Sequence, residues 1–271
     1  MKKYWPLIRR NKIILTALII VLGSLAVYLI YTREHQVLPQ AAIYFLDDIK
    51  LPNKGEKVLV FSPHPDDETI AAAGFIYDSI QRGAEIKIVL VTDGNKHHLK
   101  DRRYEEFRQA TSILGVSPEN LLFLNYPDGQ LKEENQADLT AKLQEIIDQY
   151  EPQYIIYPSS RDSHPDHATT GRLVENILKN NQKTTAYAYL VHCRHWPQPK
   201  KRAYNLYLLP PIKFISFDDN WQKLILDNSA LVKKREAVMA YQSQIREPIL
   251  RSLMLSSIRQ NELFAVEKIN D

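Results

Sequence analysis

The sequence predicts an α/β fold with a Rossmann-like, mostly parallel sheet flanked by helices, preceded by one N-terminal transmembrane helix. Apolar segments alternate with amphipathic ones between residues 57 and 192, and Val58–Phe61 is apolar at four consecutive positions. Strands covered on both faces have this pattern, and strand–helix alternation builds parallel sheets with right-handed crossovers. The third observation is an uncharged, mostly apolar run, Ile13–Tyr31.

This apolar run predicts a membrane anchor, because a bilayer-crossing helix needs about 20 mostly apolar residues. Residues 1–12 carry five cations and no acidic residue, and such basic flanks stay in the cytoplasm. We expect a cytoplasmic tail over 1–12, a single-pass transmembrane helix over 13–31 in the cell membrane, and an extracytoplasmic catalytic domain. A cleavable signal peptide is the alternative, but the run is long for one and no small-x-small cleavage site precedes its bulky end.

Residues 32–56 are expected to form a stalk or linker containing a short helix, and residues 57–271 the catalytic domain. The expected strands of this domain are 58–62, 86–92, 121–126, 154–158 and 186–191. The expected helices between them are 69–82, 103–114, 139–150 and 167–179. Beyond residue 192 we expect a basic Pro-rich loop, a strand at 213–217, a helix at 229–241 and a closing strand in 262–269.

Composition excludes several classes of function. The net charge is only +3, and much of the surplus lies in the first dozen residues, so the domain lacks the basic face that nucleic-acid binding needs. The single cysteine, Cys193, excludes an intrachain disulfide and any zinc module with two or more cysteine ligands. His192 and His195 flank this cysteine, and we interpret that segment as structural or substrate-facing rather than metal-binding.

Two clusters of histidine and carboxylate follow expected strands: "HPDDE" at 64–68 follows strand 58–62, and "HPDH" at 164–167 follows strand 154–158. Sites form at the carboxyl ends of parallel strands. A single such cluster is typical of a capped helix start. Two of them at equivalent strand ends are electrostatically costly unless a divalent cation neutralises them. Imidazole with carboxylate suits Zn²⁺ or Fe²⁺.

His64, Asp67 and His167 can supply the three ligands of a catalytic metal site with one open position. Asp66 would remain beside the ion, placed to take a proton from bound water. In the second cluster, His164 lies three residues before His167, so the two share a face if the helix begins there. Asp166 could orient a histidine from behind.

These motifs resemble those of the PIG-L/LmbE de-N-acetylases. "SPHPDDETIAAAG" is similar to the family's "AHPDDE" signature, and "SHPDH" is similar to its second signature. Weaker similarities are "TDGN" at 92–95, "RYEEFRQATSILGV" at 103–116, "YPDG" at 126–129 and "KREAVMAYQSQ" at 234–244. The resemblance covers roughly residues 57–266 and leaves out the apolar run and the stalk.

The resemblance implies a zinc-dependent enzyme that removes the N-acetyl group from an amino sugar, usually N-acetylglucosamine on a lipid or small molecule, with metal-bound water as nucleophile. Fe²⁺ or another divalent metal could replace zinc. By position, the implied ligands are His64, Asp67 and His167, and Asp66 is the implied general base. His164 would stabilise the oxyanion or protonate the leaving amine, with Asp166 supporting it. Asp93 and Arg103 would contact sugar or brace the site.

Two other functions fit parts of the pattern. One is a metal-dependent hydrolase of another amide or of a phosphoester, although phosphoryl transfer often uses two metals and a denser carboxylate set. The other is a catalytically silent, membrane-tethered glycan-binding module, which would have little reason to keep Asp66. The expected partners are an N-acetylated amino-sugar substrate, in a glycolipid or polysaccharide, and the membrane, with no nucleic acid.

Overall fold

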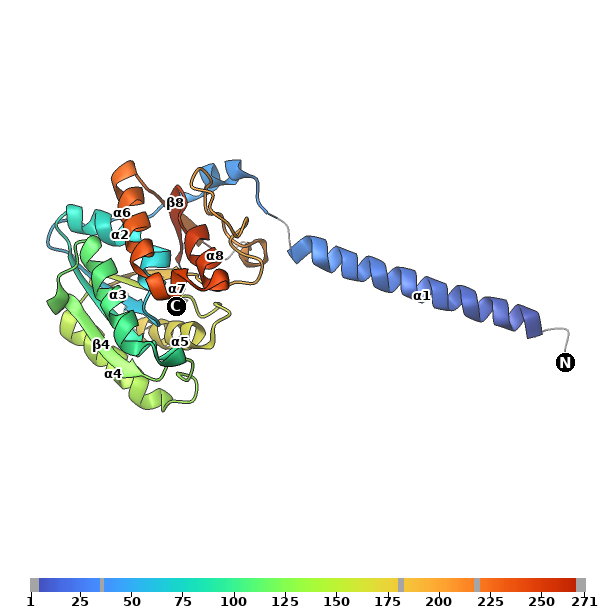
Figure 1. Ribbon diagram of the computed structural model, residues 1–271, viewed down its shortest axis with the longest axis horizontal. Coiled ribbons are helices and arrows are strands. Elements are labelled where there is room, and N and C mark those ends of the chain that lie inside the picture. Colours follow the sequence, from blue (N-terminus) through green and yellow to red (C-terminus); the bar gives the residue numbers. More distant parts are fainter. Residues whose placement is uncertain (1–4, 35–36, 180–182, 217–219, 267–271) are drawn as a thin grey trace. The chain divides into compact units, whose positions relative to one another are not determined.

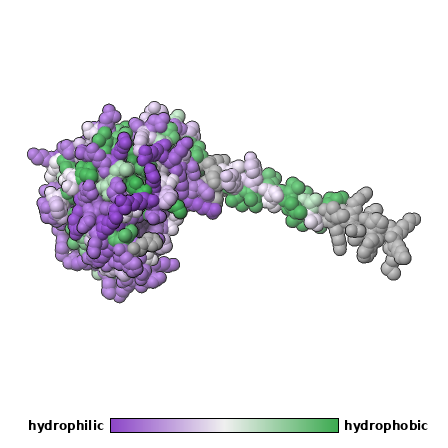
Figure 2. Space-filling view, in the orientation of Figure 1, coloured by the Kyte–Doolittle hydropathy of each residue, from purple (hydrophilic) through white to green (hydrophobic). Residues whose placement is uncertain are grey.

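The structure is a computed structural model that describes residues 5–34, 37–179, 183–216 and 220–266. The chain divides into two compact units, Met1–Leu38 and Pro39–Asp271. The first unit contains α1 (Trp5–Glu34), and among the described helices α1 alone is long and apolar enough to cross a membrane. Its candidate span, Ile14–Thr32, has a mean hydropathy of 2.5 and is not buried. Figure 2 shows hydrophobic side chains along this span.

The second unit is built on an eight-stranded sheet with the order β1-β7-β8-β6-β5-β2-β3-β4 (Figure 1). Five neighbouring strands are parallel: β2 (Lys57–Ser62), β3 (Glu85–Thr92), β4 (Leu121–Tyr126), β5 (Tyr154–Pro158) and β6 (Thr185–Tyr189). The other three are β1 (Asp47–Asp48), β7 (Asn220–Ile225) and β8 (Asn261–Val266), and β8 runs antiparallel to both β6 and β7. The predicted Rossmann-like, mostly parallel sheet is confirmed.

Helices cover both faces of this sheet. One face carries α2 (Asp67–Gln81), α3 (Lys100–Ile113) and α6 (Asn228–Ala240); the other carries α4 (Gln136–Tyr150) and α5 (Pro165–Leu178). Val58 and Val60 of β2 belong to the first core, whereas Leu59 and Phe61 belong to the second. Because side chains alternate along a strand, a strand covered on both faces needs an apolar residue at every position.

The expected central strands and helices are confirmed to within three residues, but the C-terminal part differs more. The strand expected at 213–217 is wrong over 213–216, and residue 217 lies outside the described residues: Ile212–Phe214 is a 3-10 turn, η5, that follows Pro210 and Pro211. Proline fixes φ and removes a donor, so this pair favours a turn over a strand. Two short helices, α7 (Gln242–Ile245) and α8 (Pro248–Ser256), precede β8 and were not predicted.

The segment expected as a stalk is partly folded into the second unit. After α1 the chain forms the 3-10 helix η2 (Gln40–Phe45) and then β1, which pairs with β7. The side chain of Gln40 exchanges two hydrogen bonds with the backbone of Tyr207. Two further 3-10 turns, η3 (Lys96–His98) and η4 (Pro118–Asn120), precede α3 and β4.

Candidate metal centre

The two His-Pro-Asp segments meet at the carboxyl ends of the neighbouring strands β2 and β5. The chain runs from β2 outward through β3 and β4, then returns to β5 and β6 on the other side, so the strand order reverses between β2 and β5. Open α/β sheets bind ligands at this point. Both segments lead into helices: α2 begins at Asp67, and His164 caps α5, with Pro165 at its first position.

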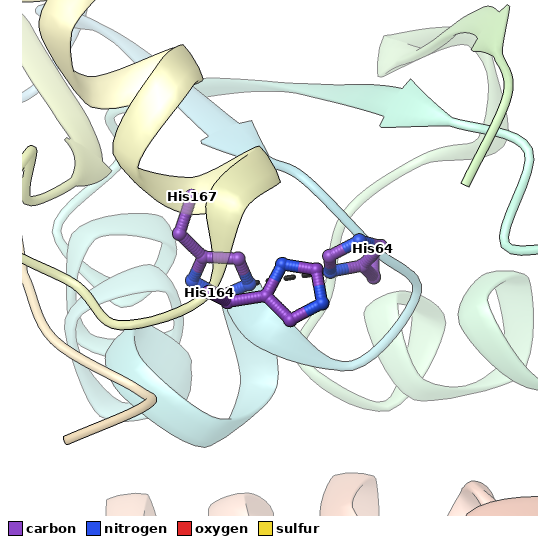
Figure 3. Close-up of side chains that lie close together, drawn as sticks. All are labelled: His64, His164 and His167. Atoms are coloured by element: carbon purple, nitrogen blue, oxygen red, sulfur yellow. Dashed lines mark hydrogen bonds between the residues drawn. The ribbon is translucent and has the colours of Figure 1, made fainter. Parts of the chain in front are cut away.

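Three of the predicted ligand atoms lie close together. Nδ1 of His64 is 3.2 Å from Oδ2 of Asp67 and 3.2 Å from Nε2 of His167, which is 3.0 Å from the same carboxylate oxygen. A tetrahedral zinc ion with bonds of 2.0–2.1 Å sets its ligand atoms about 3.3 Å apart. The donor types and their spacing therefore fit one divalent ion. Figure 3 shows the rings of His64, His164 and His167 gathered at this point.

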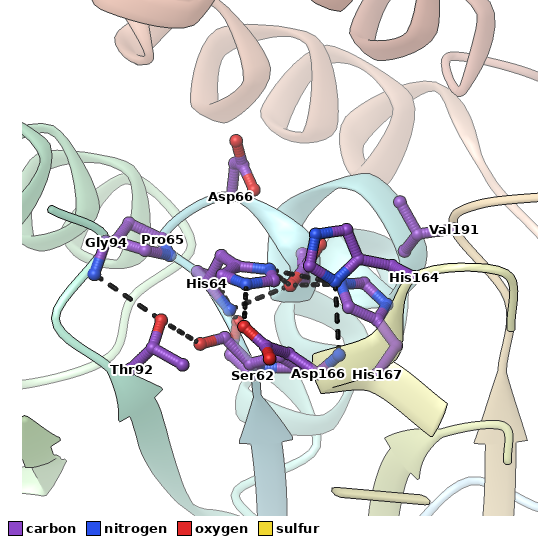
Figure 4. Close-up of polar contacts among 12 residues, drawn as sticks. Ser62, His64, Pro65, Asp66, Thr92, Gly94, His164, Asp166, His167 and Val191 are labelled. Atoms are coloured by element: carbon purple, nitrogen blue, oxygen red, sulfur yellow. Dashed lines mark hydrogen bonds and ion pairs between the residues drawn. The ribbon is translucent and has the colours of Figure 1, made fainter. Parts of the chain in front are cut away.

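The other ring nitrogen of His64 is held from behind by Asp166. Nε2 of His64 lies 2.9 Å from Oδ2 of Asp166, which also accepts a hydrogen bond of 2.7 Å from the Gly129 amide. The Leu131 amide donates to the other oxygen. Such carboxylate–histidine pairs fix the ring orientation of metal ligands. The expectation that the Asp166 side chain supports His164 needs correction, because its carboxylate meets His64 and only its backbone amide donates to His164 (Figure 4).

Asp162, which the sequence did not predict, takes the corresponding place behind His167, as an ion pair without hydrogen-bond geometry. Its Oδ2 lies 3.3 Å from Nδ1 of His167, which directs Nε2 toward the ligand cluster. The amides of Val191 and His192 donate to this oxygen, and the His164 amide donates to the other. Asp162 is 5% exposed. It therefore ties the start of α5 to the loop after β6.

Burial and nearby charges shift the pKa values of the three proposed ligand side chains. Burial lowers the pKa of His64, but hydrogen bonds to Asp166 and Asp67 outweigh it and raise the pKa to about 9. Burial also lowers the pKa of His167, and the charges of Asp67 and Asp162 raise it well above its ordinary value. Burial raises the pKa of Asp67, and the His167 charge and hydrogen bond hold it well below its ordinary value. The pocket thus favours positive charge beside Asp67.

Asp66 stands apart from this triad. It precedes α2 with φ 125°, a conformation that strains any residue except glycine, and sites often store strain in this way. Its carboxylate lies 3.4 Å from Nη2 of Arg103. Burial raises its pKa to about 8, although Arg103 opposes the shift.

Arg103 and Asp93, the two predicted substrate contacts, both brace loops. Arg103 is 6% exposed, and its guanidinium donates to the carbonyls of Pro65 (2.9 Å) and Gly94 (3.1 Å). Gly94 has φ 58°, and a Cβ there would lie 2.8 Å from the ring of Pro65, so the two loops meet closely. Asp93 accepts hydrogen bonds from the amides of Asn95 and Asp128. Contact of either side chain with sugar stays a prediction.

Two further histidines, His164 and His192, lie beside the cluster. The ring of His164 lies 4.6 Å from that of His64, and its Nδ1 accepts the Asp166 amide. The ring of His192 lies 4.8 Å from that of His167, and the two can share an ion with Asp67. Other groups able to hold an ion are His64 with His164 and His167, and His64 with Asp128 and Asp166. The sequence predicts that the segment around His192 is structural or substrate-facing, and the structure places the His192 ring beside His167.

Comparisons with known proteins agree with this geometry. Residues 59–178 match the sequence model of the PIG-L family, described as GlcNAc-PI de-N-acetylase. The matched segment contains both His-Pro-Asp clusters. Over residues 59–178 the chain is therefore similar to the PIG-L family.

Two curated proteins that the chain resembles are named as deacetylases. The chain is 32% identical over 148 residues to a probable N-acetyl-alpha-D-glucosaminyl L-malate deacetylase 2 of Bacillus anthracis, covering 48% of this chain and 64% of that protein. It is 29% identical over 133 residues to a diacetylchitobiose deacetylase of Thermococcus kodakarensis, covering 45% of this chain and 48% of that protein. The chain thus spans less than two thirds of either relative.

The fold of this chain is also found in solved structures. The N,N'-diacetylchitobiose deacetylase from Pyrococcus horikoshii superposes with a TM-score of 0.57 and 23% identity. This superposition covers 77% of this chain and 82% of that chain. At this identity the likeness shows a shared fold.

Proposed function

We propose that this protein is a membrane-anchored, metal-dependent hydrolase that removes the N-acetyl group from a GlcNAc-type unit of a glycolipid or surface glycan. The observation that carries the proposal is the meeting of His64, Asp67 and His167. Their ligand atoms lie 3.0–3.2 Å apart although the two segments are about a hundred residues apart in the chain. This arrangement lies in a domain whose relatives are deacetylases of N-acetylated sugars.

A divalent ion held by His64, Asp67 and His167, which we take to be Zn²⁺ or Fe²⁺, would polarise the acetyl carbonyl and lower the pKa of attacking water. The chain supplies the orientation of its ligands. Asp166 and Asp162 each face the rear nitrogen of one proposed ligand imidazole, so that its other nitrogen faces the cluster.

Asp66 is the proposed general base. It precedes the proposed ligand Asp67 in the sequence. Its carboxylate forms an ion pair with Arg103. A carboxylate in this position can take a proton from water and pass it to the departing nitrogen. Arg103 limits the rise in the pKa of Asp66 that burial causes, which keeps the ionised form accessible near neutral pH.

His164 is proposed to stabilise the negative charge that develops on the acetyl oxygen. Because its Nδ1 accepts the Asp166 amide, the proton of the neutral ring lies on Nε2. Burial is the largest cause that lowers the pKa of His164, which favours the neutral ring at pH 7. A neutral N–H donor suits oxyanion stabilisation better than protonation of the amine.

The anchor and its orientation complete the proposal. The span in α1 and the basic residues 1–12 support a single-pass arrangement with the N-terminus in the cytoplasm and the catalytic domain outside. A substrate on the outer face would be a lipid-linked sugar or a surface polysaccharide, both of which carry N-acetylhexosamines.

Acetate release by the full chain in detergent tests this function. The panel contains N-acetylhexosamine glycolipids, N-acetylated oligosaccharides, a non-sugar acetamide and a phosphoester. We expect release from at least one sugar, loss of activity with a chelator and its return with Zn²⁺ or Fe²⁺. The matched control is His167→Ala, which should be inactive. Turnover of the phosphoester alone, or chelator-resistant release, would contradict the proposal.

A further inference from the structure

Helix α2, which begins with the proposed ligand Asp67, is interrupted after its first turn. Ala72 has φ −137° and ψ 17°, which are not helical, so Asp67–Ala71 forms a separate turn ahead of the rest of the helix. In an unbroken helix the Gly74 amide would donate to the Ile70 carbonyl. A break leaves these backbone groups without helical partners, and buried backbone groups need partners.

A buried ion pair from the C-terminal part of the chain takes up the freed groups. Nζ of Lys234, on α6, donates to the Ile70 carbonyl at 2.9 Å. The carboxylate of Glu262, on β8, accepts the amides of Gly74 (2.8 Å) and Phe75 (2.9 Å). Lys234 also donates to Glu262 at 2.6 Å. The pair is thus inserted between the carbonyl and the amide that a regular helix would join.

Close packing also favours this insertion. Lys234 is 1% exposed and Glu262 is 0% exposed. A Cβ on Gly74 would lie 2.3 Å from a methyl group of Leu226 and 3.3 Å from the Glu262 carboxyl carbon, so glycine gives the carboxylate its room. A buried ion pair gains little net stability over an apolar pair of similar volume. The pair lies instead at the break of the helix that begins with the proposed ligand Asp67, a place from which it can fix geometry.

Helix α6 holds the first turn of α2 at a second point. The hydroxyl of Tyr241, directly after α6, donates to Oε1 of Glu68 at 2.5 Å. The other oxygen of Glu68 lies 3.0 Å from the Ser62 hydroxyl and 3.3 Å from the Asp66 amide. The turn is therefore fixed at Glu68 and at Ile70, immediately after Asp67.

We infer that Lys234 and Glu262 are positioning residues for the metal centre. They hold the break at Ala72, and the break sets the direction of the first turn, so that Asp67 faces His64 and His167. Neither residue touches the ligand cluster in the contacts described above. This inference rests on the proposed metal role of Asp67.

Binding of Co²⁺ to the full chain in detergent tests the positioning role without any turnover. The main variant is Lys234→Met/Glu262→Gln, which removes both charges together and keeps the side-chain volumes. We expect its affinity for Co²⁺, measured by competition with a chromophoric chelator, to fall about 10- to 100-fold, as for changes behind metal ligands. We also expect its visible Co²⁺ absorption to change in intensity, because Asp67 is turned away from the ion.

The matched control for general destabilisation is Leu143→Ala, in α4 on the opposite face of the sheet. This variant should lose thermal stability yet keep the wild-type Co²⁺ affinity and spectrum. If the double variant does not fold, Glu262→Gln alone, which keeps its volume and one acceptor, gives the same comparison. Wild-type affinity and spectrum in the folded variant would overturn the positioning role.

His167→Ala separates this inference from the proposed function. If His167→Ala binds Co²⁺ as tightly as the wild type, the proposed centre itself is wrong. If His167→Ala loses the ion while Lys234→Met/Glu262→Gln retains wild-type affinity, only the positioning role is overturned.

Discussion

Asp66 and Asp67 are neighbours in the chain with different proposed roles, so the pair Asp66→Asn and Asp67→Asn is a sharp test of the mechanism. Oδ2 of Asp67 lies 3.2 Å from His64 Nδ1 and 3.0 Å from His167 Nε2, and it accepts the His64 amide at 2.8 Å. The carboxylate of Asp66 instead lies 3.4 Å from Arg103. Asparagine keeps the size of either side chain and removes its charge and basicity.

The expected effects differ in kind. Loss of a general base costs about 10²- to 10⁴-fold in kcat, which is about 2.7–5.4 kcal/mol at about 1.36 kcal/mol per tenfold. Asp66→Asn should therefore retain its ion and lose most turnover. Asp67→Asn removes the only anion among the three proposed ligands, so its metal affinity should fall by more than the roughly 100-fold upper value for residues behind the ligands.

Elemental analysis and acetate release are measured on the same preparations of the full chain. The wild type should carry one ion per chain and release acetate, Asp66→Asn should carry the ion without releasing acetate at a comparable rate, and Asp67→Asn should lack the ion. Near-normal turnover by Asp66→Asn would refute its role as base. Full metal occupancy in Asp67→Asn would refute the ligand set.

Four further predictions concern other parts of the chain. Asp162→Asn should weaken metal binding about 10- to 100-fold in chelator competition; unchanged affinity would show that His167 needs no such support. Gly171→Ala should cost about 1–3 kcal/mol in denaturant unfolding, because its Cβ would lie 2.3 Å from the Pro158 carbonyl oxygen; wild-type stability would contradict this clash. In metal-free protein prepared with a chelator, the pKa of Asp66 is raised to about 8 in the folded state, against about 3.8 in the unfolded state. The free energy of unfolding should therefore fall as the pH rises between these values. The wild type should lose up to about 1.4 kcal/mol per pH unit relative to Asp66→Asn there, and parallel pH profiles would count against it. A reporter fused after residue 271 should be active outside the cytoplasm, and activity only inside would reverse the proposed topology.

The part of the site that the sequence predicts depends on local patterns. Four consecutive apolar residues, Val58–Phe61, predict a strand covered on both faces. Each His-Pro-Asp cluster comes soon after a predicted strand. Parallel strands with polar carboxyl ends tend to share a site, so the sequence predicts that His64, Asp67 and His167 meet. That β2 and β5 are neighbours comes from the structure. In the structure, Nδ1 of His64, Oδ2 of Asp67 and Nε2 of His167 lie 3.0–3.2 Å from one another.

The parts that escaped prediction depend on contacts between distant loops. Asp162 and His192 lie in loops without periodicity, and their meeting with His167 requires the loop after β6 to fold against the start of α5. The sequence does not show which histidine the side chain of Asp166 faces. Hydrogen bonds from the Gly129 and Leu131 amides hold its carboxylate toward His64.

Lys234 illustrates the same limit on a helix. A lysine in an amphipathic helix normally indicates a solvated face. Lys234 is buried because the break at Ala72 leaves the Ile70 carbonyl without a helical donor, and Lys234 supplies one. The segment that matches the PIG-L family, residues 59–178, holds every proposed ligand, the proposed base and His164. His192, Lys234, Tyr241 and Glu262 lie beyond it. Of these residues, His192 lies beside His167, and the other three hold the helix that begins with Asp67. The C-terminal part therefore positions proposed catalytic groups that lie earlier in the chain.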